Sequence, residues 1–414
     1  MPAEPILLDG RTGEGGGQLV RVACALAALT CQSVTIHHVR GNRGGDRGGG
    51  LKAQHVTSLA WLAKVTDAQV QGLDIGSKIV TFWPRRPPAN LSPRSFKIEP
   101  ETDASSALLV LQAIFPYVLF AGNANNEPLE LDIYGGTNVS WSLSYEYFDQ
   151  VLMPVLEERF GICVRRELKA RGWSMGPRSR GHIALVVQPI RKGESLKFVP
   201  WSSHSYPSSY RVCRIDISII VPQSAHEVVQ AELVRSLAEL YPGSETQVKL
   251  VEDSGHNSRW SILLVAHSQD GVRWGRDTLF SMPKPEKLKS TWQEFAQSAC
   301  ARLCKKLHAE TSQASAVDEF LQDQLIALQV LAEGVSTFPR GGPWRSEEDM
   351  LVEKLGKLEV NKEGPEMQKR EKTTQPFGNG STHTTTARWV ASKLLPGAEF
   401  YHGGDVVKGV GLSV

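Results

Sequence analysis

The chain has 414 residues, of which 41% are hydrophobic and 22% charged, a composition typical of a globular protein with one large and one further domain. The 46 basic and 44 acidic residues nearly cancel, so any surface that binds nucleic acid must be a local patch. Six cysteines without a CxxC pair favour a reducing compartment. Because neither a signal peptide nor a membrane-spanning apolar run is present, we expect a nuclear or cytoplasmic protein without a membrane partner.

Hydrophobic periodicity predicts one order of elements twice in the first half of the chain. The first set comprises strand 6–8, helix 18–29, strand 34–39, helix 51–64 and strands 68–71 and 78–83. The second set comprises strand 96–99, helix 104–120, strand 129–134, helix 145–160 and strands 162–169 and 182–187. The recurrence of β-α-β-α-β-β predicts an α+β fold built by duplication.

The second half predicts a third, partial copy of this unit. It comprises helices 317–333 and 387–395 and closing strands 399–401 and 406–410. Residues 188–311 interrupt it and predict an inserted α+β domain, in which helices 225–240 and 292–307 cover strands 212–221, 246–251 and 261–267. Residues 1–187 and 312–414 then form the large domain, within which the Glu- and Lys-rich segment 346–375 is expected to be a disordered charged loop.

The run FGNGSTHTTTA at residues 377–387 places His383 among hydroxyls and glycines at the start of a predicted helix. A histidine there can act as a nucleophile. The first turn of the helix offers free N–H groups and a partial positive charge, which attract phosphate. The alternative is that His383 is structural and that the neighbouring hydroxyls, such as Ser381, only cap the helix.

The glycine turn TGEGGGQ at residues 12–18 lies between the first strand and the first helix. Glycines let the backbone approach a ligand, and Gln18 and Arg21 share one side of the helix that follows. Arg21 is placed to reach an anion, and Glu14 offers a carboxylate for a divalent ion. The turn is neither a Walker A loop nor a dinucleotide fingerprint, and the alternative is an ordinary tight turn.

A second glycine-rich loop follows the second strand and concentrates basic residues, namely Arg40, Arg43, Arg47 and Lys52. Planar guanidinium groups on a flexible backbone suit phosphate oxygens. Similar sequences occur in disordered nucleic-acid-binding tails, but a strand and a helix flank this one closely. We therefore predict a structured anion site.

The helix at 317–333 carries Phe320, Asp323 and Gln324 away from its apolar stripe. An exposed aromatic beside a carboxylate and an amide can stack on a base and bond its edge or a ribose, although an aromatic at helical spacing more often belongs to the core. Cys300 and His308 are too far apart along one helix to bind a single tetrahedral metal ion.

Together these stretches resemble the RNA 3′-terminal phosphate cyclases. The resemblance rests on LDGRTGEGGGQLVRVACAL at the start, QH after the arginine loop, YGGTN at 134–138, DEFLQDQL at 318–325 and HTTTA at 383–387. It implies three β-α-β-α-β-β units with a smaller domain inserted in the third. It also implies an enzyme whose histidine takes AMP from ATP and passes it to an RNA 3′-phosphate. The 2′-hydroxyl then displaces AMP and leaves a 2′,3′-cyclic phosphate.

The resemblance also assigns roles to residues. His383 is similar to the nucleotidyl acceptor and Glu14 to the metal-associated acid, with Mg²⁺ or Mn²⁺ as the ion. Gln18, Arg21 and Arg43 resemble phosphate contacts, so that His383, Glu14, Arg21 and Arg43 form the expected catalytic set. The expected ATP-binding positions are Gln18, Gln112, Phe320, Leu321, Gln322, Asp323 and Gln324, with Phe320 where a tyrosine is common. The implied partner is an RNA 3′ end.

The chain departs from the family pattern at residues 177–180, where Pro177, Arg178, Ser179 and Arg180 replace a glycine triplet. This departure keeps an alternative open, a catalytically inactive relative that acts in ribosome assembly. Such relatives lack the histidine, so His383 favours the enzyme. An enolpyruvyl transferase has the same repeated unit, but its characteristic residues do not occur here.

Overall fold

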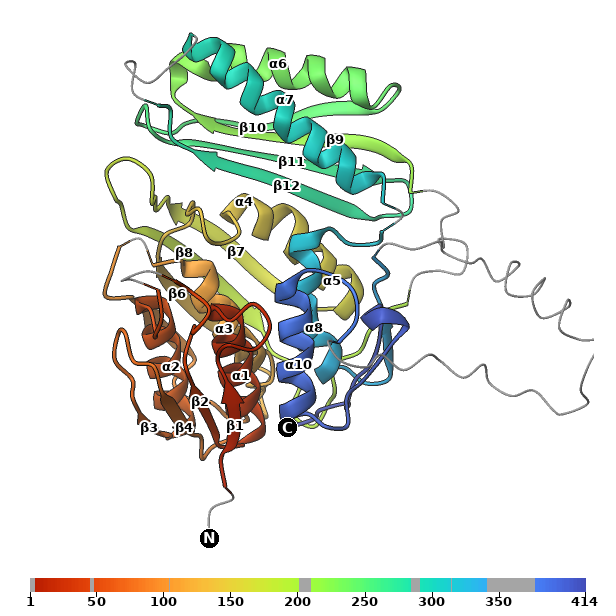
Figure 1. The fold of residues 1–414 in the computed structure, drawn as a ribbon. Coiled ribbons are helices and arrows are strands. Elements are labelled where there is room, and N and C mark those ends of the chain that lie inside the picture. The colour runs from red at the N-terminus through yellow and green to blue at the C-terminus, as the bar shows by residue number, and fades with distance from the viewer. Residues whose placement is uncertain are drawn as a thin grey trace, which may run out of the picture.

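The computed structural model describes residues 4–44, 48–103, 105–200, 210–283, 291–313, 315–340 and 377–414 and has the mixed α+β class that the sequence predicts (Figure 1). The predicted charged loop at 346–375 and Arg47 lie outside the described residues. In the part of the chain that is described, no helix is both long and apolar enough to cross a membrane.

The first sheet has the strand order β1-β2-β4-β3, with β1 and β2 parallel and the other pairs antiparallel. Its elements are β1 (Ile6–Asp9), α1 (Gly17–Thr30), β2 (Val34–His37), α2 (Ala53–Thr66), β3 (Gln69–Gln71) and β4 (Val80–Trp83). Helix α1 is buried nearly all round, because it packs against α2, α3 and α10. Helix α1 therefore lies at the centre of the large domain, with its N-terminus at the glycine turn.

The second sheet has the order β5-β6-β8-β7 and the same succession of one parallel and two antiparallel pairs. Its elements are β5 (Ser95–Ile98), α3 (Ala107–Leu119), β6 (Leu129–Gly135), β7 (Cys163–Ala170) and β8 (Gly181–Gln188). The helix expected at 145–160 is divided into α4 (Tyr145–Tyr147), a π-helical turn η1 (Phe148–Leu152) and α5 (Met153–Phe160).

A three-stranded sheet of order β13-β15-β14 closes the large domain, and all its pairs are antiparallel. Its elements are α8 (Glu319–Leu331), β13 (Val335–Thr337), α10 (Thr382–Leu394), β14 (Glu399–Tyr401) and β15 (Val406–Lys408). Strand β13 was not predicted, whereas β14 and β15, which are equally short, were.

Between β8 and α8 the chain forms a sheet of order β10-β9-β11-β12, one face of which α6 and α7 cover (Figure 1). The elements are β9 (Val212–Val221), α6 (His226–Leu240), β10 (Glu245–Asp253), β11 (Trp260–Ser268), β12 (Arg273–Phe280) and α7 (Trp292–Thr311). The three predicted strands are confirmed as β9, β10 and β11, but β12 was not predicted. Strand β12 lies at the sheet edge and is mostly half-buried, so its sequence lacks a clear apolar alternation.

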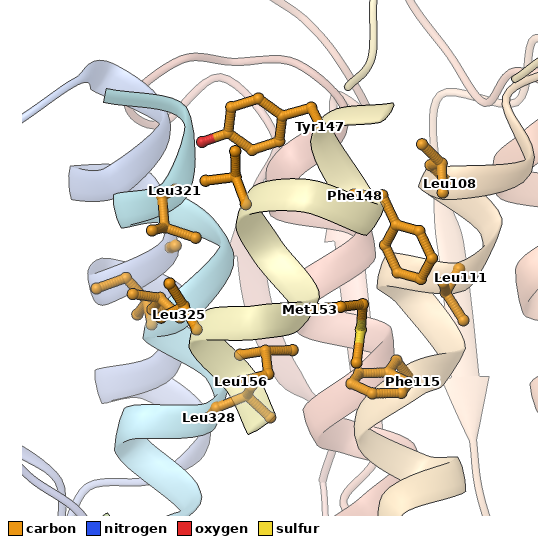
Figure 2. Close-up of a cluster of buried hydrophobic side chains, with 14 of the residues drawn as sticks. Leu108, Leu111, Phe115, Tyr147, Phe148, Met153, Leu156, Leu321, Leu325 and Leu328 are labelled. Atoms are coloured by element: carbon orange, nitrogen blue, oxygen red, sulfur yellow. The ribbon is translucent and has the colours of Figure 1, made fainter. Parts of the chain in front are cut away.

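An apolar cluster joins α3, the segment from α4 to α5, and α8 (Figure 2). Its labelled members are Leu108, Leu111, Phe115, Tyr147, Phe148, Met153, Leu156, Leu321, Leu325 and Leu328. Each fully buried large side chain of this kind stabilises the fold by about 1.5–3 kcal/mol. The cluster fixes α8 relative to α3 and so positions the polar residues at the start of α8.

Candidate active site

Helix α10 begins at Thr382, five residues earlier than the prediction of 387–395, so His383 lies inside its first turn. Ser381 is the N-cap, and its Oγ accepts a hydrogen bond of 3.2 Å from the backbone N–H of Thr384. One of the hydroxyl-bearing residues in this run, Ser381, therefore caps the helix. The expected placement of His383 at a helix N-terminus is correct, and the helix boundary was wrong.

The imidazole of His383 faces the carboxylate of Glu14, with 3.8 Å between Nδ1 and Oε2. Both atoms are buried and, among the residues that the structure describes, lack a hydrogen-bond partner. The Glu14 side chain is only 6% exposed, whereas His383 is 43% exposed. Because Nδ1 is the buried nitrogen, the ring presents its Nε2 edge to solvent. The other Glu14 oxygen, Oε1, forms an ion pair with Arg43.

The glycine turn packs directly on α10. The backbone N–H of Glu14 donates a 2.8 Å hydrogen bond to Thr386 Oγ1, which itself donates to the carbonyl of Thr382 at 2.6 Å. Gly13 has a φ of 63°, and a Cβ there would lie 2.2 Å from Thr386 Oγ1. Glycine is thus required both by the backbone conformation and by the close approach of α10.

Arg21 is buried next to the glycine turn and is held by two amides. Its Nε donates to Gln112 Oε1 at 2.5 Å, and its Nη2 donates to Gln18 Oε1 at 2.8 Å. Burial lowers the pKa of Arg21 to about 10, so the guanidinium stays charged at neutral pH. Since neither amide neutralises it, Arg21 supplies a fixed positive charge, and the expected grouping of these three residues is observed.

His55, in the QH pair of the sequence, is a site residue whose role was not predicted. The backbone N–H of Lys52 donates to His55 Nδ1 at 3.0 Å, which leaves the proton of a neutral ring on Nε2. That Nε2 is buried and has no hydrogen-bond partner in the described part of the chain. Burial, followed by the charges of Arg21, Arg40 and Lys52, lowers the pKa of His55 well below 6.5. His55 is therefore a neutral hydrogen-bond donor.

Gly17 lies between these two donors at the start of α1. A Cβ added there would lie 2.6 Å from Arg21 Nη1 and 2.7 Å from His55 Nε2. The space above Gly17 therefore faces a guanidinium, an imidazole N–H and a helix N-terminus. This arrangement suits an oxyanion.

One cleft of about 990 Å³ contains these groups. It is lined by Glu14, Gly17, Arg21, Arg40, Arg43, Lys52, Ala53, Gln54, His55, Ile75, Glu101, Thr102, Asp103, Ser105, Leu109, Trp141, Arg178 and His383. The arginine loop thus contributes to the same cleft as the glycine turn, as predicted. Trp141 also lines the cleft and was not predicted, because no charge pattern surrounds it in the sequence.

The polar residues of α8 separate into two groups. Asp323 and Gln324 line a narrow apolar pocket between α1, α3, α5 and α8, and Gln112 lies on the same pocket wall. Burial raises the pKa of Asp323 to about 6, while the nearby charges of His383 and Arg21 act in the opposite direction. Gln112, Asp323 and Gln324 are therefore brought together as expected.

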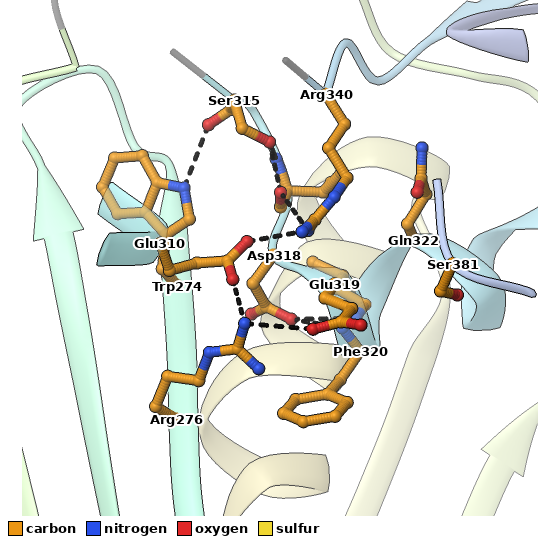
Figure 3. A network of polar contacts seen from close by, with 12 residues as sticks. Trp274, Arg276, Glu310, Ser315, Asp318, Glu319, Phe320, Gln322, Arg340 and Ser381 are labelled. Carbon is orange, nitrogen blue, oxygen red and sulfur yellow. Dashed lines mark hydrogen bonds and ion pairs between the residues drawn. The ribbon is translucent and has the colours of Figure 1, made fainter. Parts of the chain in front are cut away.

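The remaining expected residues of α8 point elsewhere. Leu321 is fully buried in the apolar cluster (Figure 2), and Gln322 accepts a 3.4 Å hydrogen bond from Thr384 Oγ1. The ring of Phe320 lies beneath the guanidinium of Arg276, 4.6 Å from its carbon (Figure 3). Phe320 lines neither the cleft nor the apolar pocket.

A buried polar network explains the direction of Phe320 (Figure 3). Asp318 caps α8 by accepting from the backbone N–H groups of Phe320 and Leu321, each at 2.9 Å. It also accepts from the N–H of Gly275 in β12 at 2.8 Å. Arg276, next along β12, pairs with Glu310 and covers Phe320. Strand β12 and helix α7 thereby fix the first turn of α8.

Among the described residues no group of three or more His, Cys, Asp or Glu side chains is arranged to bind a metal ion. Cys300 and Cys304 are buried on α7, as the interpretation of a helix face predicts. The Oε2 atom of Glu14 is a single buried carboxylate oxygen without a donor. It suits a divalent ion whose other ligands come from a phosphorylated substrate and water.

A model of the RNA 3′-terminal phosphate cyclase family matches residues 12–398, a span that includes the glycine turn, the arginine loop, α8 and His383. Proteins named RNA 3′-terminal phosphate cyclase show similar matches. That of Drosophila melanogaster is 30% identical over 82% of this chain and 88% of its own length. That of Pyrococcus furiosus is 29% identical, with coverages of 80% and 86%. That of Methanopyrus kandleri is 29% identical, with coverages of 90% and 99%. The chain belongs to the RNA 3′-terminal phosphate cyclase family.

Proposed function

We propose that the chain converts an RNA 3′-terminal phosphate to a 2′,3′-cyclic phosphate with ATP, through a covalent His383–AMP intermediate and an RNA-adenylate. The observation that carries this proposal is the pairing of His383 with Glu14 in a cleft that also holds Arg21 and Arg43. A nucleophile beside a carboxylate and two guanidinium groups suits nucleotidyl transfer.

In the first step the Nε2 lone pair of His383 attacks the α-phosphorus of ATP, a P–N bond forms, and the bond to pyrophosphate breaks. The ring then carries a positive charge with its proton on Nδ1. Glu14 Oε2, 3.8 Å from Nδ1 and otherwise unpartnered, is placed to stabilise that charge. Arg21 and the N–H of His55 are placed to bind the departing phosphates at Gly17.

In the second step an oxygen of the RNA 3′-phosphate attacks the same phosphorus, and the P–N bond to His383 breaks. In the third step the 2′-hydroxyl loses its proton and attacks the 3′-phosphate, which releases AMP. A divalent ion held by Glu14 would neutralise phosphate charge. Arg43, which pairs with Glu14 and is 49% exposed, is free to turn toward an incoming RNA phosphate.

The apolar pocket beside α8 supports an adenosine site. Its aliphatic and aromatic walls suit a base, and Gln112, Asp323 and Gln324 offer polar atoms for a base edge or ribose. Gln112 also bonds Arg21, which places the pocket next to the anion site at Gly17. Phe320 is outside both cavities, so we propose no stacking role for it.

We also propose that the large domain contains three copies of one β-α-β-α-β-β unit. The strand orders β1-β2-β4-β3 and β5-β6-β8-β7 support this, with the same parallel and antiparallel pairs in each. The order β13-β15-β14 matches the last three strands of that pattern. Residues 188–311 would then be the insertion into the third copy.

Incubation with ATP labelled in its α-phosphate and a divalent ion tests the function. We expect a label on the protein that is acid-labile and base-stable, as a P–N bond is. His383→Ala should abolish it, whereas His308→Ala, in α7 of the inserted domain, should retain it. Absence of label from the wild-type protein would contradict the proposal and favour the ribosome-assembly alternative.

A further inference from the structure

The wall of the cleft that holds His383 includes an exposed tryptophan. Trp141 lies in the connection between β6 and α4, is 52% exposed and lines the same cleft as His383. Most of the other exposed large hydrophobic residues lie outside this cleft, with Ile75 the exception. A tryptophan left open in a cleft wall is typical of a surface that binds an aromatic or apolar ligand.

Arg178, from the segment that replaces the family's glycines, lines the same cleft. Its loop is held closed by two backbone hydrogen bonds between Trp173 and Ser179, of 3.0 and 3.4 Å. Arg259 of the inserted domain donates to the carbonyl of Pro177 at 2.6 Å. Arg178 is exposed and, within the described ranges, has no ion-pair partner.

The second arginine of that segment has a different role. Arg180 donates to Asp103 Oδ1 at 2.9 Å and to the carbonyl of Pro100 at 3.0 Å. It therefore neutralises an acid of the cleft wall and fixes the base of the loop. Of the two arginines that replace glycines, only Arg178 presents its charge to the cleft.

We propose that the RNA strand upstream of the reacting 3′ end passes along Trp141 and Arg178, with a base stacked on Trp141 and a backbone phosphate bound by Arg178. This inference rests on the proposed function. Proteins that bind single-stranded RNA combine a basic groove that follows the RNA backbone with aromatic side chains on which the bases stack. Four basic residues, Arg40, Arg43, Lys52 and Arg178, line the same cleft as Trp141.

The proposal also explains why arginine replaces glycine here. A glycine loop admits a backbone to close range, whereas Arg178 reaches a phosphate from a loop that the inserted domain holds in place. Recognition of a stacked base and a phosphate is independent of sequence. The chain should therefore prefer longer RNA over a dinucleotide without preferring particular bases at that position.

Fluorescence anisotropy with 3′-phosphorylated RNA tests this. The probes are a dinucleotide and a decamer, each carrying a 5′ dye, and the quantity of interest is the ratio of their dissociation constants. We expect the wild-type protein to bind the decamer at least tenfold more tightly than the dinucleotide. Trp141→Ala and Arg178→Ala should each remove most of that gain, and Trp141→Phe should restore it.

Two further measurements separate binding from structure. Arg178→Ala should reduce the slope of log binding constant against log salt by about one, whereas Trp141→Ala should leave the slope unchanged. Arg180→Ala is the matched control, and it should lower the melting temperature but keep the length preference. A loss of preference in Arg180→Ala equal to that in Arg178→Ala would assign the effect to loop structure and overturn the proposal.

Equal binding of the two RNAs by the wild-type protein would also overturn it, whatever the result with labelled ATP. Conversely, a Trp141-dependent length preference in a protein that takes no label from ATP would support this surface and contradict the proposed reaction. The binding and labelling assays thus give separate answers.

Discussion

The backbone N–H of Glu14 donates a 2.8 Å hydrogen bond to Thr386 Oγ1, although 372 positions separate the two residues. This contact joins the glycine turn to the helix that carries His383. The carboxylate of Glu14 and the imidazole of His383 therefore face each other because the Glu14 backbone is bonded to a side chain of the helix that carries His383, and not through a direct side-chain hydrogen bond.

Replacing Thr386 by valine should impair labelling by ATP more than it destabilises the fold. The change keeps the shape of the side chain but removes one acceptor and one donor, a loss of about 1 kcal/mol in the free energy of unfolding. Labelling should slow by at least tenfold, because His383 and Glu14 lose their common anchor. The control is Thr385→Val, since the hydroxyl of Thr385 donates to the carbonyls of Ser381 and Thr382 at the start of the same helix and not to the glycine turn. Equal labelling rates in the two variants would contradict this role.

Arg43→Ala should reduce nucleotide or RNA use far more than stability. Arg43 is half exposed, and exposed ion pairs contribute about 0–1 kcal/mol to folding. Arg11→Ala is a suitable comparison, because Arg11 is similarly exposed and pairs with Asp9 instead of a cleft residue. Melting temperatures and labelling rates would be measured for both variants. A fall in stability that accounts for all of the lost activity would make Arg43 a structural residue.

Gly17→Ala should block the anion site while leaving the helix intact. The new methyl group would occupy the space between Arg21 Nη1 and His55 Nε2, and alanine is the better helix former by about 1 kcal/mol. We expect the increase in melting temperature caused by ATP to disappear. Gly44→Ala is the control, because a Cβ at Gly44 meets no atom within 4 Å. Unchanged ATP stabilisation in Gly17→Ala would place the phosphates elsewhere.

Local signals explain which parts of the site could be predicted. Glycines beside a strand end identified the turn that carries Glu14, and hydroxyls and glycines before an apolar stripe identified the helix that carries His383. These features depend on residues close in sequence, so a single chain reveals them. That the two would meet was expected only from the family resemblance.

Long-range packing decided the features that could not be predicted. Phe320 was expected to face a ligand, but Arg276 from an unpredicted edge strand covers its ring. Arg388 is fully buried and bonds four carbonyls, including those of Phe377 and Asn379, which holds the segment before His383 in place. No periodicity distinguishes such an arginine from one on a solvated helix face.

Asp323→Asn should change how stability depends on pH. Burial raises the pKa of Asp323 from 3.8 to about 6, so between these values the folded protein holds a proton that the unfolded chain has released. The contribution of Asp323 to the free energy of unfolding is therefore complete below about pH 4 and is lost as the pH rises through about 6. In Asp323→Asn this contribution should not change with pH. Urea unfolding of both proteins at pH 4, 5, 6 and 7 would measure the free energies.

The wild-type profile also includes Asp318 and Asp405, whose pKa values burial likewise raises to about 6, and Asp277, whose pKa burial also raises, so the variant should remove only one of several contributions. The difference in free energy of unfolding between Asp323→Asn and the wild-type protein should grow in favour of the variant from pH 4 to pH 7. If the free energies of unfolding of the two proteins changed with pH in parallel, Asp323 would titrate as in the unfolded chain and the prediction would be wrong. At neutral pH the fold therefore bears the cost of an ionised carboxylate at an apolar pocket, and a ligand that donates a hydroxyl to Asp323 would relieve it. ATP should accordingly stabilise the wild-type protein more than Asp323→Asn.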